Sequence, residues 1–376
     1  MSWESFNLNE DLSRGIYRFG FEKPTPIQEK AIPPMIEGRD VIAQGQSGTG
    51  KTGSFTIGAL QKVDLSSKTT QVLILAPTFE LVKQISSVVS ALSSAMDGLV
   101  VKTLVGGTSV SDDSADLRTN CPHVVVGTAG RVYDMCRRRS LLTDSIKVFI
   151  LDEADEMLSK GFKDQMYDIF QFLHDNVQVA LFSATMPDEM LALSEKFMRD
   201  PVRIVMKTEE LTLECIQQYY IALKDDHTKY ETLKDLFSFL QVSQCIIYVS
   251  TVKRVEDLYN TMCTDGFPVC CIHSAMDKSE RDKSLQSFRK GAFRVMVSSG
   301  VTARGIDVQQ VSTVINFDMT RSYETYLHAI GRSGRFGRKG LAINFITKQD
   351  IDFMRRLERH YNITINELPS NFETLI

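Results

Sequence analysis

The chain has 376 residues, more than one hydrophobic core ordinarily holds, so two domains are expected. Hydrophobic residues make up 43% and charged residues 24%, as in globular proteins, and no apolar run approaches the roughly 20 residues that cross a bilayer. A formal net charge of −4 excludes a protein that holds nucleic acid by bulk positive charge. Three local basic clusters, at 137–139, 335–339 and 355–356, are most simply solvated surfaces.

The cysteine pattern and the N-terminus bear on the cellular setting. Seven cysteines include no Cys-x-x-Cys pair, so neither a zinc site nor a disulfide framework is indicated. The first residues lack the basic and apolar regions of a signal peptide. We therefore expect a reducing, intracellular setting, with the cytoplasm as the first choice and the nucleus as the alternative.

Short apolar runs recur along the chain, and they are apolar on both sides of the pleat, as in strands buried in a parallel sheet. They cover residues 72–76, 124–126, 148–151, 179–182, 245–249, 269–272, 295–297 and 341–346. Amphipathic segments lie between them, including a helix predicted to follow a capping box at 228–231. This alternation predicts two doubly wound parallel α/β domains.

The alternation of predicted strands and helices is interrupted once. Residues 206–214 are charged and rich in threonine, and the alternation restarts beyond them. We interpret this segment as a short linker between a domain at 1–205 and a domain at 215–376.

The strongest motif lies near the start of the chain. Residues 45–52 match the phosphate-binding loop G-x-x-x-x-G-K-[ST], and residues 40–43 are predicted to form the strand before it. The backbone N–H groups of such a loop turn toward phosphates, here from Ser47, Gly48, Thr49 and Gly50. Lys51 is expected to reach the β- and γ-phosphates and Thr52 to ligate Mg²⁺. The loop therefore predicts ATP and Mg²⁺ as cofactors.

A second motif supplies acids. The apolar run 149–151 ends in Asp152 and Glu153. Asp152 is expected to hold Mg²⁺ and Glu153 to orient or deprotonate water. Together with the phosphate loop, the pair predicts hydrolysis of ATP, with Lys51, Asp152 and Glu153 as catalytic residues.

The run Asp152-Glu153-Ala154-Asp155 resembles the signature of the DEAD-box RNA helicases, and the family's other motifs follow in order over nearly the whole chain. Within the family, the chain is most similar to the eukaryotic translation initiation factor four-A group. The resemblance implies two tandem RecA-like domains and an ATP-dependent RNA helicase that unwinds short duplexes, acting in translation initiation. It also implies RNA as a partner, a protein partner of the initiation-scaffold type, no membrane and a monomer.

The resemblance assigns further residues to nucleotide binding and to coupling. Adenine recognition is implied for Phe21, Lys23 and Gln28 in the first domain. Nucleotide contacts from the second domain are implied for Gly305, Asp307, Arg332, Arg335 and Phe336, with the two arginines as catalytic fingers that stabilise the γ-phosphate charge. Coupling of hydrolysis to domain closure is implied for Asp155, Ser183, Thr185 and His328.

Contacts with the RNA backbone, which give binding without sequence preference, are implied at seven positions. These are Thr78, Gly107, Thr128, Arg131, Gln286, Arg289 and Ser299. The sequence departs from the family around them, at Phe79, Val82, Ala129, Val252, Ser299, Gly300 and Ala329. The departures spare the phosphate and Mg²⁺ residues but touch RNA contact and coupling. A second possible function is therefore an ATP-dependent RNA clamp or assembly scaffold with weak unwinding. A third, a DNA translocase, fits the signature less well.

Overall fold

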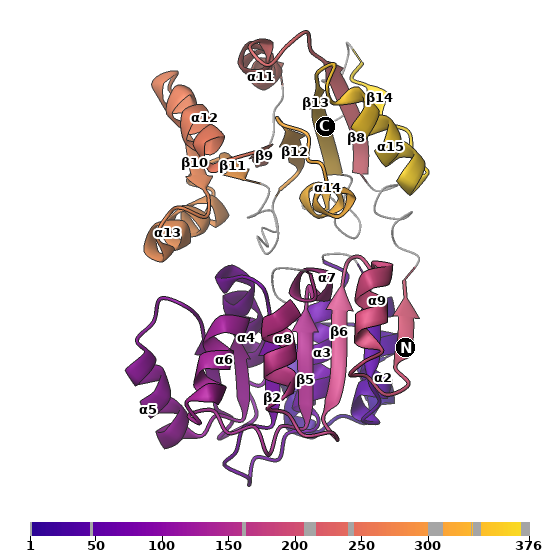
Figure 1. Cartoon of the computed structure of the whole chain (residues 1–376), viewed down its shortest axis with the longest axis vertical. Coiled ribbons are helices and arrows are strands. Elements are labelled where there is room, and N and C mark those ends of the chain that lie inside the picture. Colours follow the sequence, from indigo (N-terminus) through magenta and orange to yellow (C-terminus); the bar gives the residue numbers. More distant parts are fainter. Residues whose placement is uncertain are drawn as a thin grey trace. The chain divides into compact units, whose positions relative to one another are not determined.

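The structure is a computed structural model, and it describes residues 2–45, 48–159, 163–206, 216–239, 244–299, 311–331, 333 and 340–369. The chain divides into two compact units, Met1–Met206 and Lys207–Ile376 (Figure 1). Apart from Met206, the predicted linker lies outside the described residues. In the part of the chain that is described, no helix is both long and apolar enough to cross a membrane.

The first unit contains a parallel sheet of seven strands in the order β3-β4-β2-β5-β6-β1-β7. Their bounds are β1 Val41–Gln44, β2 Val72–Leu75, β3 Val101–Leu104, β4 Val124–Gly127, β5 Val148–Asp152, β6 Gln178–Ser183 and β7 Val202–Val205. Strands that are neighbours in the sheet are distant in sequence, and each pairing is parallel, as between β5 and β6. The chain must therefore return to the same edge of the sheet between strands, and helices make these crossovers.

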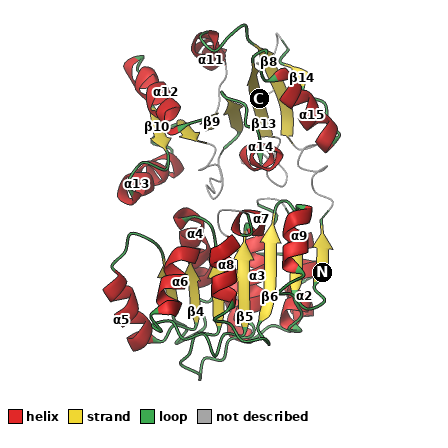
Figure 2. Cartoon of the chain, viewed as in Figure 1, coloured by secondary structure: helices red, strands yellow, loops and turns green. Residues whose placement is uncertain are grey.

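Helices cover both faces of this sheet (Figure 2). One face carries η1 Trp3–Phe6, α1 Glu10–Arg18, α2 Pro26–Ile36, α3 Lys51–Leu60 and α4 Phe79–Leu92. The other carries α5 Val110–Asn120, α6 Ala129–Arg137, α7 Ala154–Met157, α8 Lys163–Phe170 and α9 Asp188–Ser194. Successive residues of β5 enter the two cores alternately, because Val148 and Ile150 face the first set of helices while Phe149 and Leu151 face the second.

The second unit repeats this design with strands in the order β10-β11-β9-β12-β13-β8-β14. Their bounds are β8 Ile216–Ala222, β9 Cys245–Val249, β10 Val269–Ile272, β11 Val295–Ser299, β12 Thr313–Asn316, β13 Gly340–Ile346 and β14 Asn366–Glu367. One face packs against α11 Thr228–Phe239 and α12 Val252–Thr264. The other packs against α13 Lys278–Arg289, α14 Tyr323–Ile330 and α15 Ile351–Tyr361. The predicted doubly wound α/β fold is confirmed.

The sequence-based elements agree with the structure, apart from the ends of strands and one helix start. Each predicted apolar run is a buried strand or lies within a residue of one. The predicted capping box at 228–231 is wrong, because α11 already begins at Thr228. Asp225 precedes this helix, and its Oδ1 accepts a hydrogen bond from the Thr228 backbone N–H at 3.2 Å.

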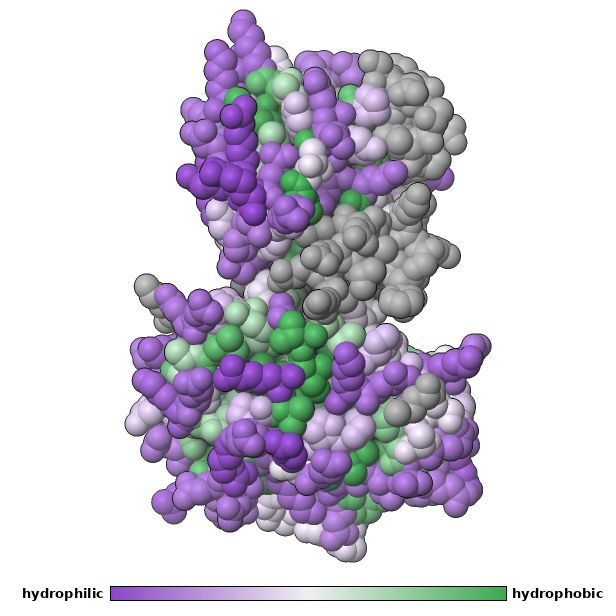
Figure 3. Space-filling view, turned by 90° about the vertical axis from the view of Figure 1, so that its right-hand side faces the viewer, coloured by the Kyte–Doolittle hydropathy of each residue, from purple (hydrophilic) through white to green (hydrophobic). Residues whose placement is uncertain are grey.

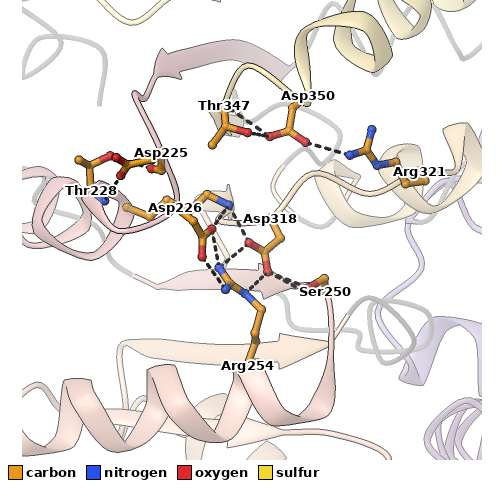
Figure 4. A network of polar contacts seen from close by, with 10 residues as sticks. Asp225, Asp226, Thr228, Ser250, Arg254, Asp318, Arg321, Thr347 and Asp350 are labelled. Atoms are coloured by element: carbon orange, nitrogen blue, oxygen red, sulfur yellow. Dashed lines mark hydrogen bonds and ion pairs between the residues drawn. The ribbon is translucent and has the colours of Figure 1, made fainter.

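An ion-pair network ties together strand ends in the second unit (Figure 4). Asp318, just beyond β12, accepts hydrogen bonds from Lys229 Nζ at 2.8 Å and from Arg254 Nε at 2.6 Å. The Ser250 backbone N–H, which follows β9, donates to the same carboxylate at 2.9 Å. Burial raises the pKa of Asp318, but the bonds from Lys229, Ser250 and Arg254 more than offset it, so the pKa lies below the ordinary 3.8.

This network predicts a pH-dependent loss of stability for Asp318→Asn. The substitution removes the buried carboxylate that Lys229 and Arg254 share and leaves them only the more exposed Asp226, which should cost about 2 kcal/mol at neutral pH. Because the folded-state pKa is depressed, the carboxylate's contribution is present above the ordinary pKa and is lost as the pH falls through the folded-state value. The difference from the parent should therefore shrink in acid. Calorimetric unfolding checks this, with the exposed Asp257→Asn as control; a difference that does not depend on pH would contradict it.

Candidate nucleotide and RNA site of the first unit

Apart from the adenine-binding segment and Arg131, the predicted site residues of the first unit lie at or just beyond strand ends of its sheet. The phosphate loop follows β1, Thr78 follows β2, Gly107 follows β3, and Thr128 directly follows β4. Asp152 closes β5 and Ser183 closes β6. Because the strands are parallel, these carboxyl ends share one edge, the usual ligand position of open α/β sheets. Segments far apart in sequence are thereby brought to one edge.

The described part of the phosphate loop has the backbone that its glycines allow. Gly48 and Gly50 have φ angles of 83° and 102°, in the left-handed region that favours glycine. Lys51 begins α3, and its buried Nζ donates to the Gly45 carbonyl at 2.6 Å. The Gly45 N–H donates to the Ser183 carbonyl at 3.0 Å, which fastens the loop to the end of β6. Thr52 is half-buried in the first turn of α3, and Ser47 lies outside the described residues.

The predicted adenine-binding segment packs directly against the phosphate helix. A Cβ atom on Gly53 would lie 2.7 Å from Gln28 Nε2 and 3.0 Å from Phe21 Cε2. Gln28 is 1% exposed, its Oε1 accepts from the Thr25 backbone N–H at 2.8 Å, and its Nε2 lies 3.4 Å from the Gly50 carbonyl. The amide is therefore oriented from both ends. An amide nitrogen has a second hydrogen to offer an adenine edge. Lys23 is exposed.

Trp3 is a supporting residue that the sequence analysis missed. Its ring stacks on Phe21 at 6.1 Å with an interplanar angle of 13°, and its Nε1 donates to the Phe21 carbonyl at 3.0 Å. Trp3 is 2% exposed, so it fixes the back of the Phe21 ring. The sequence feature that could have pointed to Trp3 is that it is the single tryptophan of the chain.

Asp152 and Glu153 are a buried acid pair, each 4% exposed. Burial, the neighbouring Glu153 charge and Asp155 raise the pKa of Asp152 to about 7, while Lys51 and the Glu153 N–H oppose the rise. That N–H donates to Asp152 Oδ1 at 3.0 Å. Glu153 has a φ of 50°, unusual for a residue with a side chain, and its Oε2 is buried without a hydrogen-bond partner among the described residues. Two neighbouring buried carboxyl groups need a positively charged partner, such as a metal ion, to compensate their charge.

The predicted coupling residues of the first unit contact one another. Thr185 Oγ1 donates to Asp155 Oδ2 at 2.6 Å, and the Asp155 N–H lies 3.4 Å from Ser183 Oγ. The segment after β6 is therefore bonded to the segment that carries the acid pair. His328 lies in α14 of the second unit, where it is buried. Its coupling role stays a prediction.

The predicted RNA contacts of the first unit surround Arg131. Its guanidinium pairs with Asp113 and donates through Nη2 to the Thr108 carbonyl at 2.8 Å. These bonds hold the loop that contains Gly107, whose φ of 81° requires glycine-like freedom. Thr78 caps α4 by accepting from the Leu81 N–H at 3.3 Å, and Thr128 precedes α6. Contact of these residues with RNA stays a prediction.

Three predicted RNA contacts belong to the second unit. Gln286 and Arg289 are exposed on α13, and Ser299 is buried at the end of β11. Six predicted site residues lie outside the described residues: Ser47, Gly305, Asp307, Arg332, Arg335 and Phe336. Of the departures, Phe79 opens α4 with its ring 5.7 Å from Lys83 Nζ, and Ala329 is 3% exposed in α14.

A phosphate loop and an acid pair at the carboxyl edge of a parallel sheet, followed by a second unit of the same design, define a nucleotide-dependent helicase core. Residues 25–193 match the DEAD/DEAH box helicase family and residues 228–337 match the helicase conserved C-terminal domain. The chain belongs to the DEAD/DEAH box helicases. This confirms the family expected from the sequence and the prediction of two RecA-like domains.

Similar proteins span the whole chain. It is 51% identical over 375 residues to the ATP-dependent RNA helicase eIF4A of Phaeosphaeria nodorum. The match covers 100% of this chain and 94% of that protein. The Neurospora crassa protein of the same name gives the same values. Among solved structures, S. cerevisiae Dbp5 bound to RNA and ADP BeF3 is similar with a TM-score of 0.92 and 33% identity, covering 100% of this chain and 98% of that one.

The geometry predicts that Gln28 selects adenine. Gln28→Glu keeps an acceptor for the Thr25 N–H but loses the amide donor, so ATP affinity should fall about tenfold while GTP affinity changes little. Competition with a fluorescent nucleotide measures both affinities. Gln28→Ala, which loses both groups, should weaken ATP at least as much. Equal losses for ATP and GTP in both variants would contradict the assignment and leave Phe21 as the main base contact.

Proposed function

We propose that this chain acts in translation initiation, in the cytoplasm, as a monomeric RNA helicase that works with a protein partner of the scaffold type. Its two fungal eIF4A relatives, similar over the full chain, support this role. The enzymatic activity is supported by the edge of the first sheet, where Lys51, Asp152 and Glu153 are all buried.

The chain is an ATP-dependent RNA helicase, as the sequence predicted. Its family consists of helicases. The similar Dbp5 protein was solved with RNA and ADP BeF3 bound. Lys51 begins α3 directly after the loop, where its ammonium group compensates phosphate charge. Glu153 follows Asp152 at the end of β5, where it can orient the attacking water and accept its proton. The bond between Thr185 and Asp155 would transmit changes at this edge to the segment after β6.

The donor set also fits Mg²⁺. Asp152 and Glu153 place hard oxygen atoms in a buried site, and the Thr52 hydroxyl lies in the first turn after the phosphate loop. We infer that Asp152 and Thr52 hold the ion, which neutralises charge on the transferred phosphate. The raised pKa of Asp152 and the unpartnered Oε2 of Glu153 support this inference. The arginine fingers Arg332 and Arg335 stay a prediction.

Glu153→Gln tests the catalytic assignment. The amide keeps the shape of the side chain but cannot accept a proton, so hydrolysis should fall at least about a hundredfold while ATP binding is retained. Steady-state turnover and nucleotide binding are the two measurements. Glu189→Gln, an exposed change on α9, is the control and should leave turnover unchanged. Turnover of Glu153→Gln within a few-fold of the parent would remove Glu153 from this role.

Phe79 accounts for part of the expected need for a partner. It directly follows Thr78. The family resemblance implies an arginine at this position, and we infer that its replacement by Phe79 removes one phosphate contact. Phe79→Arg should tighten single-stranded RNA binding and steepen its dependence on log salt by about 0.7, the value for one added phosphate contact. The exposed Ser87→Arg adds the same charge elsewhere on α4 and should do neither. If both variants bind RNA like the parent, the substitution at Phe79 does not limit RNA contact.

A further inference from the structure

The solvent face of α15 carries a concentration of positive charge that the helicase core does not use. Arg355, Arg356 and Arg359 are all exposed on this helix, whose apolar side, including Phe353 and Leu357, is buried. Within the described part of the chain, none of the three guanidinium groups lies at ion-pair distance from a carboxylate. Arg359 Nε donates only to the Arg355 carbonyl, at 3.3 Å. Three cations thus share one face in a chain of net charge −4.

Helix stability explains only part of this charge. Arg359 lies in the last turn of α15, where a cation interacts favourably with the helix dipole. Arg355 and Arg356 lie in the middle of the helix, beyond the reach of that effect. Arg355 and Arg359 are four residues apart, a spacing at which like charges repel. Asp352, three and four residues before Arg355 and Arg356, offsets part of this repulsion, but it is one carboxylate beside three guanidinium groups. The face therefore keeps an excess of positive charge that an anionic ligand would neutralise.

An aromatic stack lies beside these arginines. Tyr323 stacks between Phe353, at 5.5 Å and 16°, and His360, at 4.4 Å and 13°. Phe353 is 3% exposed, whereas His360 is exposed at the outer end of the stack. Tyr361 meets the His360 ring edge-on, at 77°, and so limits its rotation. His360 and Arg356 are four residues apart and share one side of the helix. A flat ring is thus held next to a cation.

The face is separate from the predicted RNA contacts of the same unit. α15 packs on the end of the sheet formed by β13 and β8. α13, which carries Gln286 and Arg289, packs against β10 at the other end of the strand order. Strongly hydrophilic side chains gather on the side of the second unit that faces the viewer in Figure 3, the side on which α15 lies in Figure 1.

We propose that this face is a second binding surface for single-stranded RNA. Arg355, Arg356 and Arg359 bind phosphates without reading sequence, and the exposed ring of His360 stacks on a base. Cations beside an available ring are the combination that binds single strands. An acidic protein segment would use the charges but not the ring, so RNA is favoured. The proposal rests on the proposed helicase function and adds a contact for RNA that extends beyond the core.

The main test compares the triple variant Arg355→Ala, Arg356→Ala, Arg359→Ala with the parent. Binding of oligouridylates of about 10 and about 40 nucleotides is measured with Mg²⁺ and a non-hydrolysable ATP analogue. The long RNA should bind the variant about tenfold more weakly, with a salt slope about 2 units shallower, while the short RNA is unaffected. The control removes three exposed cations elsewhere, by Lys196→Ala, Lys224→Ala and Lys253→Ala, and should bind both RNAs like the parent.

The stacking contact has its own test. His360→Ala should weaken the long RNA about fivefold, and His360→Phe, which restores a flat ring, should recover the loss. Unchanged binding of the long RNA in the triple variant overturns the proposal, as does an equal loss in the lysine control. Binding of polyglutamate that only the triple variant loses, with RNA binding unchanged, would assign the face to an acidic protein instead. A parent that binds neither RNA would also overturn the proposed helicase function, whereas normal binding of the short RNA leaves that function standing.

Discussion

The first unit is organised around the burial of two neighbouring carboxyl groups at the end of β5. Asp152 and Glu153 are each 4% exposed, and burying like charges together is costly unless a positive partner is supplied. Lys51 lowers the pKa of Asp152 but does not restore its ordinary value, since the pKa stays raised to about 7. A divalent cation with a nucleotide would complete the compensation. Ligand binding and the stability of this edge are therefore coupled.

The same edge explains how one small region senses several ligands. Gly45 is bonded to Ser183, and Asp155 is bonded to Thr185, so the phosphate loop, the acid pair and the end of β6 form one connected set. Beside it, Phe21 packs against Gly53 of α3, and Trp3 stacks on Phe21. Parallel topology brings these residues together from widely separated stretches of chain, and hydrogen bonds then fix their positions.

Most strands of the two sheets could be predicted from the sequence, because a strand that is buried on both faces has a continuous run of apolar residues. The strands that escaped prediction are β3, β7, β8, β12 and β14. Two of them, β8, Ile216–Ala222, and β12, Thr313–Asn316, carry buried polar side chains. Asn316 donates to Asn344 at 2.8 Å, and Tyr326 bonds both Asn344 and Gln218, at 3.2 and 2.8 Å. Only the folded neighbourhood satisfies these groups, so local pattern could not reveal them.

The site also contains residues that the sequence predicted and residues that it did not. The phosphate loop and the acid pair were predictable because their chemistry needs fixed residue types at fixed spacing. Trp3 was missed because its role depends on a stack with a ring 18 positions away. Arg131 shows a further limit: a family resemblance implies an RNA contact, whereas the fold gives its guanidinium an ion pair with Asp113 and a bond to Thr108. Sequence identifies a charge, but only structure shows how it is paired.

If the acid pair at the end of β5 holds nucleotide through a divalent cation, Mg²⁺ should change the stability of the protein only when nucleotide and Asp152 are both present. The melting temperatures of the parent and of Asp152→Asn, measured with a non-hydrolysable ATP analogue with and without Mg²⁺, test this. We expect Mg²⁺ to increase strongly the stabilisation of the parent by the nucleotide, because binding to the native state raises its stability. This increase should be largely lost in Asp152→Asn. An equal effect of Mg²⁺ on both proteins would show that Asp152 does not hold the cation.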